Sequence, residues 1–89
     1  MPEIKLEIKN KVGLHARPAA LFVQTANQFR STISIKNGAT IANAKSILNV
    51  LTLGVGNGAI ITVIAEGEDA EKALGALMAL NANNYGEEV

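Results

Sequence analysis

The sequence predicts an α+β fold, an open-faced β-sandwich of element order βαββαβα in which a four-stranded antiparallel sheet carries three helices on one face. Two patterns alternate along the chain: a period-two alternation of apolar and polar residues, typical of half-buried strands, and a helical spacing of apolar residues. The Asn37-Gly38 pair between two strand patterns is a strong hairpin signal. Placing the helices together is the simplest way to cover one face of an antiparallel sheet.

Length and composition indicate one small globular domain, residues 1–89. With 48% hydrophobic and 18% charged residues, the chain can bury one core but has no room for a second module. Its formal net charge of +0 gives no general attraction to nucleic acid or to an anionic membrane. Because the chain has 0 cysteines and 1 histidine, we expect no disulfide, no metal site and no cofactor. Neither a membrane-length apolar run nor a signal peptide is visible, so we expect a soluble, cytoplasmic protein.

The first strand and the first helix follow from residue spacing. Ile4, Leu6 and Ile8 alternate with charged side chains, so one face of the strand is expected to point inward. The helix is expected to begin at about Ala16, and its buried stripe comprises Ala19, Phe22, Val23 and Ala26. Its solvent side then comprises Ala20, Gln24 and Asn27.

A hairpin is predicted after this helix. Residues 32–36 alternate as a second strand, and residues 40–43 return as a third after Asn37-Gly38. Further on, residues 54–58 are rich in glycine. We expect them to form a flexible connector rather than a dinucleotide-binding loop, because they precede a strand and their glycine spacing differs from that motif.

Between the hairpin and this connector lies a short apolar segment that begins at Ser46. A serine suits the N-cap of a helix, so we expect a short helix after it. Such a short helix cannot easily bury all its apolar residues, and we expect Leu48, with part of Ile47 or Leu51, to remain exposed. The alternative is that these residues and Val50 all belong to the core.

The last third of the chain is predicted to form a strand and a helix. Residues 60–65 are almost continuously apolar, which favours a central place in the sheet. Asp69 is placed to cap the last helix, whose inner stripe comprises Ala73, Leu74, Leu77 and Leu80. Several asparagines and a glycine then weaken helix propensity, so the acidic end, residues 87–89, is expected to fray.

One short stretch brings the only histidine to the start of the first helix. Gly13 permits a turn that a residue with a Cβ resists, and Pro18 suits the first helical turn. With His15 as the flanking cap, the helix start attracts anions and favours a neutral imidazole, which has the lone pair that a phosphoryl-accepting nucleophile needs. Since Pro18 has no N–H, the nearest backbone donors are those of Ala16 and Arg17.

Arg17 strengthens the interpretation as a phosphate site. Its guanidinium is a planar, permanently charged fork that suits phosphate oxygens. A single histidine beside a helix start is more often a solvated or capping residue, and on the residues alone that alternative stays open. We therefore take His15 and Arg17 as candidate catalytic residues, and the amides of Ala16 and Arg17 as candidate phosphate donors.

These residues carry a resemblance to a known family. Gly13-Leu14-His15-Ala16-Arg17-Pro18-Ala19-Ala20 resembles the active-site signature of HPr, the histidine-containing phosphocarrier family of the phosphoenolpyruvate-dependent sugar phosphotransferase system. The likeness continues through Ala44-Lys45-Ser46-Ile47, Leu53-Gly54 and Ala65-Glu66-Gly67-Glu68-Asp69. The resemblance implies the same open-faced sandwich, and a component of a phosphotransferase system rather than a stand-alone enzyme.

By this resemblance, His15 accepts a phosphoryl group from phosphorylated enzyme I and passes it to sugar-specific IIA domains. The family's usual assignment places the phosphate on Nδ1 of this histidine, although the residues alone do not show which ring nitrogen carries it. The family's pattern also implies a docking patch for partners, which comprises Ala16, Ala20, Ile47, Leu48 and Leu51, rimmed by Arg17, Gln24 and Lys45. We expect a monomer that binds neither nucleic acid nor membrane.

Ser46 matches a regulatory serine of the family. In many low-GC Gram-positive relatives this serine is phosphorylated by an ATP-dependent HPr kinase/phosphorylase, and the product acts on a catabolite-repression transcription regulator. A phosphate there would add about two negative charges to the docking patch and slow phosphate acceptance at His15. Leu48 and Asn49 stand where methionine and glycine are frequent, which leaves a capping role alone as the alternative.

Three other functions are weighed against this one. An HPr-like catabolite-repression regulator has a similar helix but carries glutamine at the position of His15. A nitrogen-regulatory phosphocarrier would use the same chemistry with different partners. An RNA-binding sheet needs exposed aromatic residues and a basic surface, which the few aromatic residues and zero net charge do not supply.

Overall fold

The computed structural model describes residues 2–11 and 13–86 and confirms the predicted order of elements. The strands are β1 (Glu3–Glu7), β2 (Thr32–Asn37), β3 (Thr40–Asn43) and β4 (Ile60–Glu66). The helices are α1 (Ala16–Ala26), α2 (Ile47–Thr52) and α3 (Ala70–Ala82), followed by a short 3-10 turn, η1 (Asn84–Gly86). The expected fraying of residues 87–89 lies outside the described residues.

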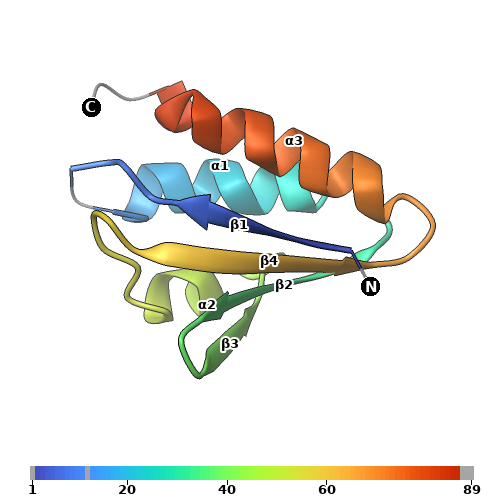
Figure 1. Ribbon diagram of the computed structural model, residues 1–89, viewed down its shortest axis with the longest axis horizontal. Helices are drawn as coiled ribbons and strands as arrows, with labels where there is room; N and C mark the ends of the chain where they lie inside the picture. Colours follow the sequence, from blue (N-terminus) through green and yellow to red (C-terminus); the bar gives the residue numbers. More distant parts are fainter. Residues whose placement is uncertain (1, 12, 87–89) are drawn as a thin grey trace.

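The strands form one antiparallel sheet in the order β1-β4-β2-β3. β4 pairs with both β1 and β2, which confirms the central place predicted from its apolar run. Helix α1 contacts both α3 and α2, and the three helices cover one face of the sheet (Figure 1). The result is the predicted open-faced sandwich, and no helix within residues 2–11 and 13–86 is long and apolar enough to cross a membrane.

The core lies between the sheet and the helices, and the alternation of each strand explains its composition. The strands contribute the fully buried Ile33, Ile35, Ile61, Val63 and Ala65. Helix α1 contributes Ala19, Phe22 and Ala26. Val23 is only partly buried, because it lies at the edge of the stripe that these three residues define.

Residues 81–86 are more regular in structure than their asparagines suggest. Helix α3 continues to Ala82, and Tyr85 in the turn after it is 1% exposed, with its ring 6.4 Å from that of Phe22. Asn84 and Tyr85 both have left-handed backbone conformations, with φ of 51° and 55°, which are costly for residues other than glycine. Burial of the Tyr85 ring offsets this cost, and it raises the pKa of the Tyr85 hydroxyl above its ordinary value.

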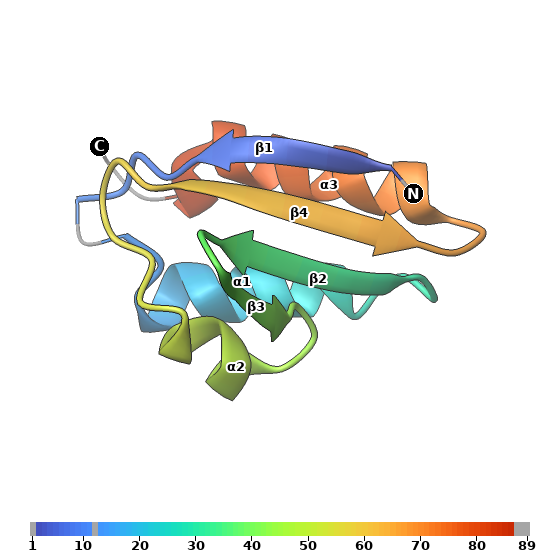
Figure 2. The ribbon, with the colours of Figure 1, turned by 60° about the horizontal axis from the view of Figure 1, so that its bottom comes forward.

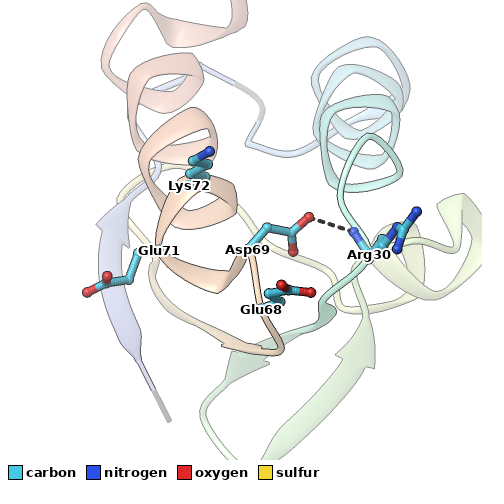
Figure 3. A pocket seen from close by; sticks show the side chains of 5 residues that line it. All are labelled: Arg30, Glu68, Asp69, Glu71 and Lys72. Carbon is cyan, nitrogen blue, oxygen red and sulfur yellow. Dashed lines mark hydrogen bonds between the residues drawn. The ribbon is translucent and has the colours of Figure 1, made fainter.

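Asp69 occupies the N-cap position of α3, but its side chain does not cap that helix. Its carboxylate instead accepts a hydrogen bond from the backbone N–H of Arg30 at 2.9 Å (Figure 3). It also accepts hydrogen bonds from the N–H of Ser31 at 3.0 Å and from the Ser31 hydroxyl. The backbone of Asp69, with φ −104° and ψ 22°, departs from the extended conformation of a capping residue. The bond from the Ser31 hydroxyl, followed by that from the Arg30 N–H, lowers the pKa of Asp69 to about 2.

Candidate functional site

His15 lies at the N-cap of α1, as the sequence predicts. Its backbone is extended, with φ −81° and ψ −171°, and its carbonyl accepts the first bond of the helix from the Ala19 N–H at 2.9 Å. The imidazole makes no capping hydrogen bond to its own helix. The half-buried side chain of His15 therefore stands at the helix end without serving as its cap.

The groups that could bind an anion are concentrated next to His15. Ala16 and Arg17 are the first two residues of α1, and both are exposed. Because Ala19 donates the first intrahelical bond and Pro18 has no N–H, the amides of Ala16 and Arg17 have no acceptor within their helix. These amides, the Arg17 guanidinium and the partial positive charge of the helix end suit phosphate oxygens.

Gly13 fixes the turn that delivers His15 to this position. Its φ is +71°, and a Cβ added there would lie 2.2 Å from the carbonyl oxygen of Val55 and 2.6 Å from Cα of Gly56. The Val55 carbonyl also accepts a hydrogen bond from the N–H of Leu14 at 3.0 Å. Glycine is therefore required by the close approach of a second segment as well as by the turn itself.

That second segment is the glycine-rich connector, residues 54–58. Its role in holding the loop before α1 is not predicted by the sequence. It is a connector, as expected, but it is hydrogen-bonded along the loop that precedes α1 rather than loose. At its end, the Gly58 N–H donates to the Ile8 carbonyl at 2.7 Å, and Val55 is buried. No local sequence pattern signals such a contact, because the two loops are far apart in the chain.

Helix α2 lies beside α1 and runs back toward the start of α1 (Figure 2). At its start, the Asn27 side chain at the C-terminal end of α1 donates to the Lys45 carbonyl at 3.2 Å. After its end, the carbonyl of Val55 in the connector accepts a hydrogen bond from the N–H of Leu14, next to His15. The two helices are therefore antiparallel, and successive turns of α2 lie progressively closer to His15.

The exposed residues of α2 confirm the predicted apolar surface. Leu48 is 70% exposed, Ile47 39% and Leu51 38%, while Val50 is fully buried, so the alternative in which all four belong to the core is wrong. On α1, Ala16, Arg17 and Gln24 are exposed and Ala20 is half-buried. The structure thus brings the sequence-predicted patch residues onto two adjacent helices, with Leu51 one turn nearer to His15 than Leu48.

The residues at the start of α2 agree only partly with expectation. Ser46 caps the helix as predicted, since its hydroxyl accepts a hydrogen bond from the N–H of Asn49 at 3.3 Å. Lys45, expected at the rim of the patch, instead directs its ammonium to the carbonyl of Phe29, at 2.6 Å. Its charge therefore stabilises the segment after α1, because an ammonium and the carbonyl oxygens near a helix C-terminus attract each other.

A pocket of about 430 Å³ lies at the opposite end of the molecule from His15, between the end of α1 and the start of α3. Arg30, Glu68, Asp69, Glu71 and Lys72 line it (Figure 3). Its charges are mixed, and within the described part of the chain no group of three or more acidic, histidine or cysteine residues could hold a metal ion. His15, at the start of α1, is not among the residues that line this pocket.

Taken together, the fold and this site define a small α+β sandwich protein with its one histidine at the N-terminus of a helix. Residues 2–83 match the family model described as the PTS HPr component phosphorylation site. The chain belongs to the HPr family.

Relatives of this chain within the family include proteins named Crh and proteins named HPr. The chain is 51% identical to the HPr-like protein Crh of Halalkalibacterium halodurans, over 89% of this chain and 94% of the relative. It is 40% identical to the phosphocarrier protein HPr of Xylella fastidiosa, over 99% of both chains. Among solved structures, HPr of Thermoanaerobacter tengcongensis is 50% identical, with all of both chains covered and a TM-score of 0.96, and a dimer of that protein matches with a TM-score of 0.79 over 98% of this chain and 100% of the other.

Proposed function

We propose that this protein is a phosphocarrier that accepts a phosphoryl group on His15 from phosphorylated enzyme I and passes it to sugar-specific IIA domains, in the cytoplasm. The observation that carries the proposal is the placement of the only histidine at the N-cap of α1, directly before the amides of Ala16 and Arg17. Membership of the HPr family supports the same chemistry.

The transfer requires one bond to form and one to break at phosphorus. The lone pair of a neutral imidazole nitrogen attacks, while the bond from phosphorus to its donor atom on enzyme I breaks and its electron pair returns to that atom. The proton on the second ring nitrogen stays in place, so no general base is needed. The amides of Ala16 and Arg17 and the Arg17 guanidinium stabilise the charge on the equatorial oxygens as the group moves.

An open site suits a carrier because the phosphoryl group must leave as readily as it arrives. Two amides and one guanidinium stabilise it without enclosing it, and the next nucleophile can approach from solvent. A deep, fully clamped site would bind the group more tightly and release it more slowly.

The second candidate is an HPr-like catabolite-repression regulator. The observation that favours it is the 51% identity to a Crh protein, against 40% to the Xylella HPr, although the Thermoanaerobacter HPr is 50% identical. Against it, that regulator carries glutamine where this chain has His15. A nitrogen-regulatory phosphocarrier would share the chemistry of His15 and differ only in its partners, so transfer to sugar-specific IIA domains separates it from the favoured function.

Intact mass separates the carrier from the regulator. After incubation with phosphoenolpyruvate and purified enzyme I, the carrier gains one acid-labile phosphate, and His15→Ala gains none. A regulator gains an acid-stable phosphate only with ATP and an HPr kinase/phosphorylase, and Ser46→Ala abolishes it. Absence of any acid-labile phosphate on the wild-type protein would rule out the carrier.

Both phosphate additions could occur on one chain. Ser46 is the cap of α2 in the docking surface, so a phosphate there would place about two negative charges beside the apolar residues that receive enzyme I. We therefore expect a protein first phosphorylated on Ser46 to accept phosphate on His15 more slowly. A catabolite-repression transcription regulator is the corresponding partner for the Ser46-phosphorylated form.

The docking patch predicts a large effect from one exposed leucine. Leu48→Asp places a charge on a surface that must lose water when a partner binds, so we expect its affinity for enzyme I to fall about tenfold or more. Ile41→Asp is the matched control, because Ile41 on β3 is 63% exposed but lies outside the patch. Isothermal titration with both variants measures the difference, and equal affinities would remove α2 from the docking surface.

We further propose that the working form is a single chain, which leaves His15 open to both partners. A relative has been solved as a dimer, so sedimentation at micromolar concentration is the appropriate measurement. A stable dimer that accepts phosphate at an undiminished rate would contradict the requirement for a single chain.

A further inference from the structure

The loop that leads from β1 to His15 is held by side-chain amides of asparagines. The exposed Asn57, in the connector, donates its carboxamide N–H groups to the carbonyls of Lys9 at 3.1 Å and Asn10 at 2.9 Å. Asn10 in turn is 1% exposed, and its own carboxamide donates to the carbonyl of Asn84 at 3.1 Å. The loop is thus attached on one side to the connector and on the other to the turn η1.

These contacts continue through the backbone to His15. The Asn10 carbonyl that accepts from Asn57 also accepts from the N–H of Gly13, at 3.1 Å. The Gly13 carbonyl accepts from the N–H of His15, at 3.0 Å. One hydrogen-bonded path therefore runs from the Asn57 carboxamide through Asn10 and Gly13 to the backbone of His15.

The turn η1 connects the same loop to the helix that His15 begins. Asn84 accepts from Asn10, and the next residue, Tyr85, packs its ring on Phe22 of α1. The Tyr85 hydroxyl donates to the side-chain oxygen of Asn81 at 2.9 Å, and the Asn81 carboxamide donates to the carbonyl of Glu7 at 3.1 Å. The end of β1, the loop and α1 are therefore held by one set of contacts, of which only the bond from Asn81 to Glu7 is exposed.

We propose that Asn57 and Asn10 are positioning residues for phosphoryl transfer at His15. The inference rests on the proposed function, because it concerns the geometry of that reaction. Displacing a reacting group by about 1 Å can cost about a hundredfold in rate, so the loop before His15 must be held tightly relative to the amides of Ala16 and Arg17. Carboxamides achieve this without adding a charge near the group that is transferred.

The test is Asn57→Ala, which removes both donated hydrogen bonds from an exposed residue and leaves the core unchanged. We measure the rate of phosphate acceptance from enzyme I, with phosphoenolpyruvate as the source, as a function of the concentration of the variant. We expect the maximal rate to fall about tenfold. The half-saturating concentration is expected to change less than twofold, since the patch on α1 and α2 is untouched.

Asn27→Ala is the matched control. Asn27 is also exposed and also donates its carboxamide to two carbonyls, those of Val23 at 3.0 Å and Lys45 at 3.2 Å, but at the other end of α1. Its maximal rate is expected to equal that of the wild type. Equal losses in both variants would indicate general loosening and overturn the proposal.

Amide hydrogen exchange supplies a readout that does not depend on enzyme I. In Asn57→Ala, the amides of Gly13 and His15 are expected to exchange about tenfold faster, while that of Leu77 in the core of α3 is unchanged. Exchange that is unchanged at Gly13 and His15 would overturn the proposal. If the wild type accepts no phosphate, the proposed function fails; if it accepts phosphate and Asn57→Ala matches it in maximal rate, only the positioning role fails.

Discussion

The two ends of helix α1 are held in place by different chemistry. At the N-terminal end the holding groups are neutral: the carboxamides of Asn57 and Asn10 and the tight turn at Gly13. At the C-terminal end they are charged, since the Asp69 carboxylate accepts the amides that follow the helix and the Lys45 ammonium donates to a carbonyl there. One helix is thus fixed by uncharged groups where the phosphate is proposed to arrive and by ionised groups at the other end.

The difference indicates how a small protein can fix the position of a reactive helix end without changing the charge around it. A further fixed charge beside His15, in addition to that of Arg17, would interact with each arriving phosphoryl group, whereas a carboxamide holds a carbonyl and adds no net charge. The charged contacts lie about 16 Å away, the length of eleven helical residues, where solvent screening weakens their influence. Titration of the Asp69 carboxylate should therefore affect the C-terminal end of α1 and leave the loop at its N-terminal end unchanged.

The largest expected effect is that of removing the ring that attaches η1 to α1. Tyr85→Ala deletes a side chain that is 1% exposed, so the free energy of unfolding should fall by about 4 kcal/mol. Tyr85→Phe keeps the ring and loses only the bond to Asn81, so about 1 kcal/mol is expected. Chemical denaturation measures both variants, and a loss below about 1.5 kcal/mol in Tyr85→Ala would mean that the turn is not part of the core.

The next effect concerns the turn before His15. Gly13→Ala places a Cβ 2.2 Å from the Val55 carbonyl and requires a left-handed backbone of a non-glycine residue, so a loss of about 3 kcal/mol is expected. Gly54→Ala is the control, because its φ of +65° is similar but nothing lies within 4 Å of the added Cβ. The control should lose only about 1 kcal/mol in the same denaturation experiment. Similar losses in the two variants would show that the connector does not constrain Gly13.

The smallest effect is the pH dependence of the C-terminal end. The bonds from Ser31 and Arg30 lower the pKa of Asp69 from 3.8 to about 2, so the carboxylate stabilises the folded state above pH 4. This contribution is lost as the pH falls from about 4 to about 2, because the folded protein then binds the proton less readily than the unfolded chain.

In Asp69→Asn, the melting temperature at neutral pH should be lower and its decrease between pH 4 and pH 2 should be smaller than in the wild type. Glu68→Gln, which alters a neighbouring carboxylate in the same pocket, is the control and should retain the wild-type decrease. The protection factor of the Gly13 amide in hydrogen exchange should not follow this titration in the wild type or in Asp69→Asn. If it did, the two ends of α1 would not be independent.

The sequence predicted most of the fold because each element carries its own local signal. The alternation in β1 and β2, the Asn37-Gly38 turn and the serine cap of α2 all act over a few residues, and the two strands, the turn and the helix formed where they were expected. The position of His15 was predictable for the same reason, since a glycine before it and a proline after it mark a helix start.

The contacts that hold this helix start could not be predicted, because they join segments distant in the chain. Asparagine at Asn57 and Asn81 indicates a turn or a weakened helix by local propensity, yet both side chains bind carbonyls of the first ten residues. The sequence correctly predicted Asp69 at a helix start. Its carboxylate accepts hydrogen bonds from amides of the segment after α1, and this depends on the approach of that segment. The hydrogen-bond partners of these three side chains are set by tertiary proximity and not by residue propensity.

The antiparallel arrangement of α1 and α2 has a steric consequence for regulation. His15 begins one helix, and Ser46 begins the other beside Asn27 at the far end of the first, so the two residues are separated by about 20 Å, with about 18 Å along α1 and about 9 Å between the helices. A protein interface of ordinary size covers about 800 Å² per partner, a footprint about 30 Å across. A footprint of this width that spans α1 and α2 covers both residues, so the proposed donor to His15 and a kinase acting on Ser46 would have to take turns if both dock across the two helices.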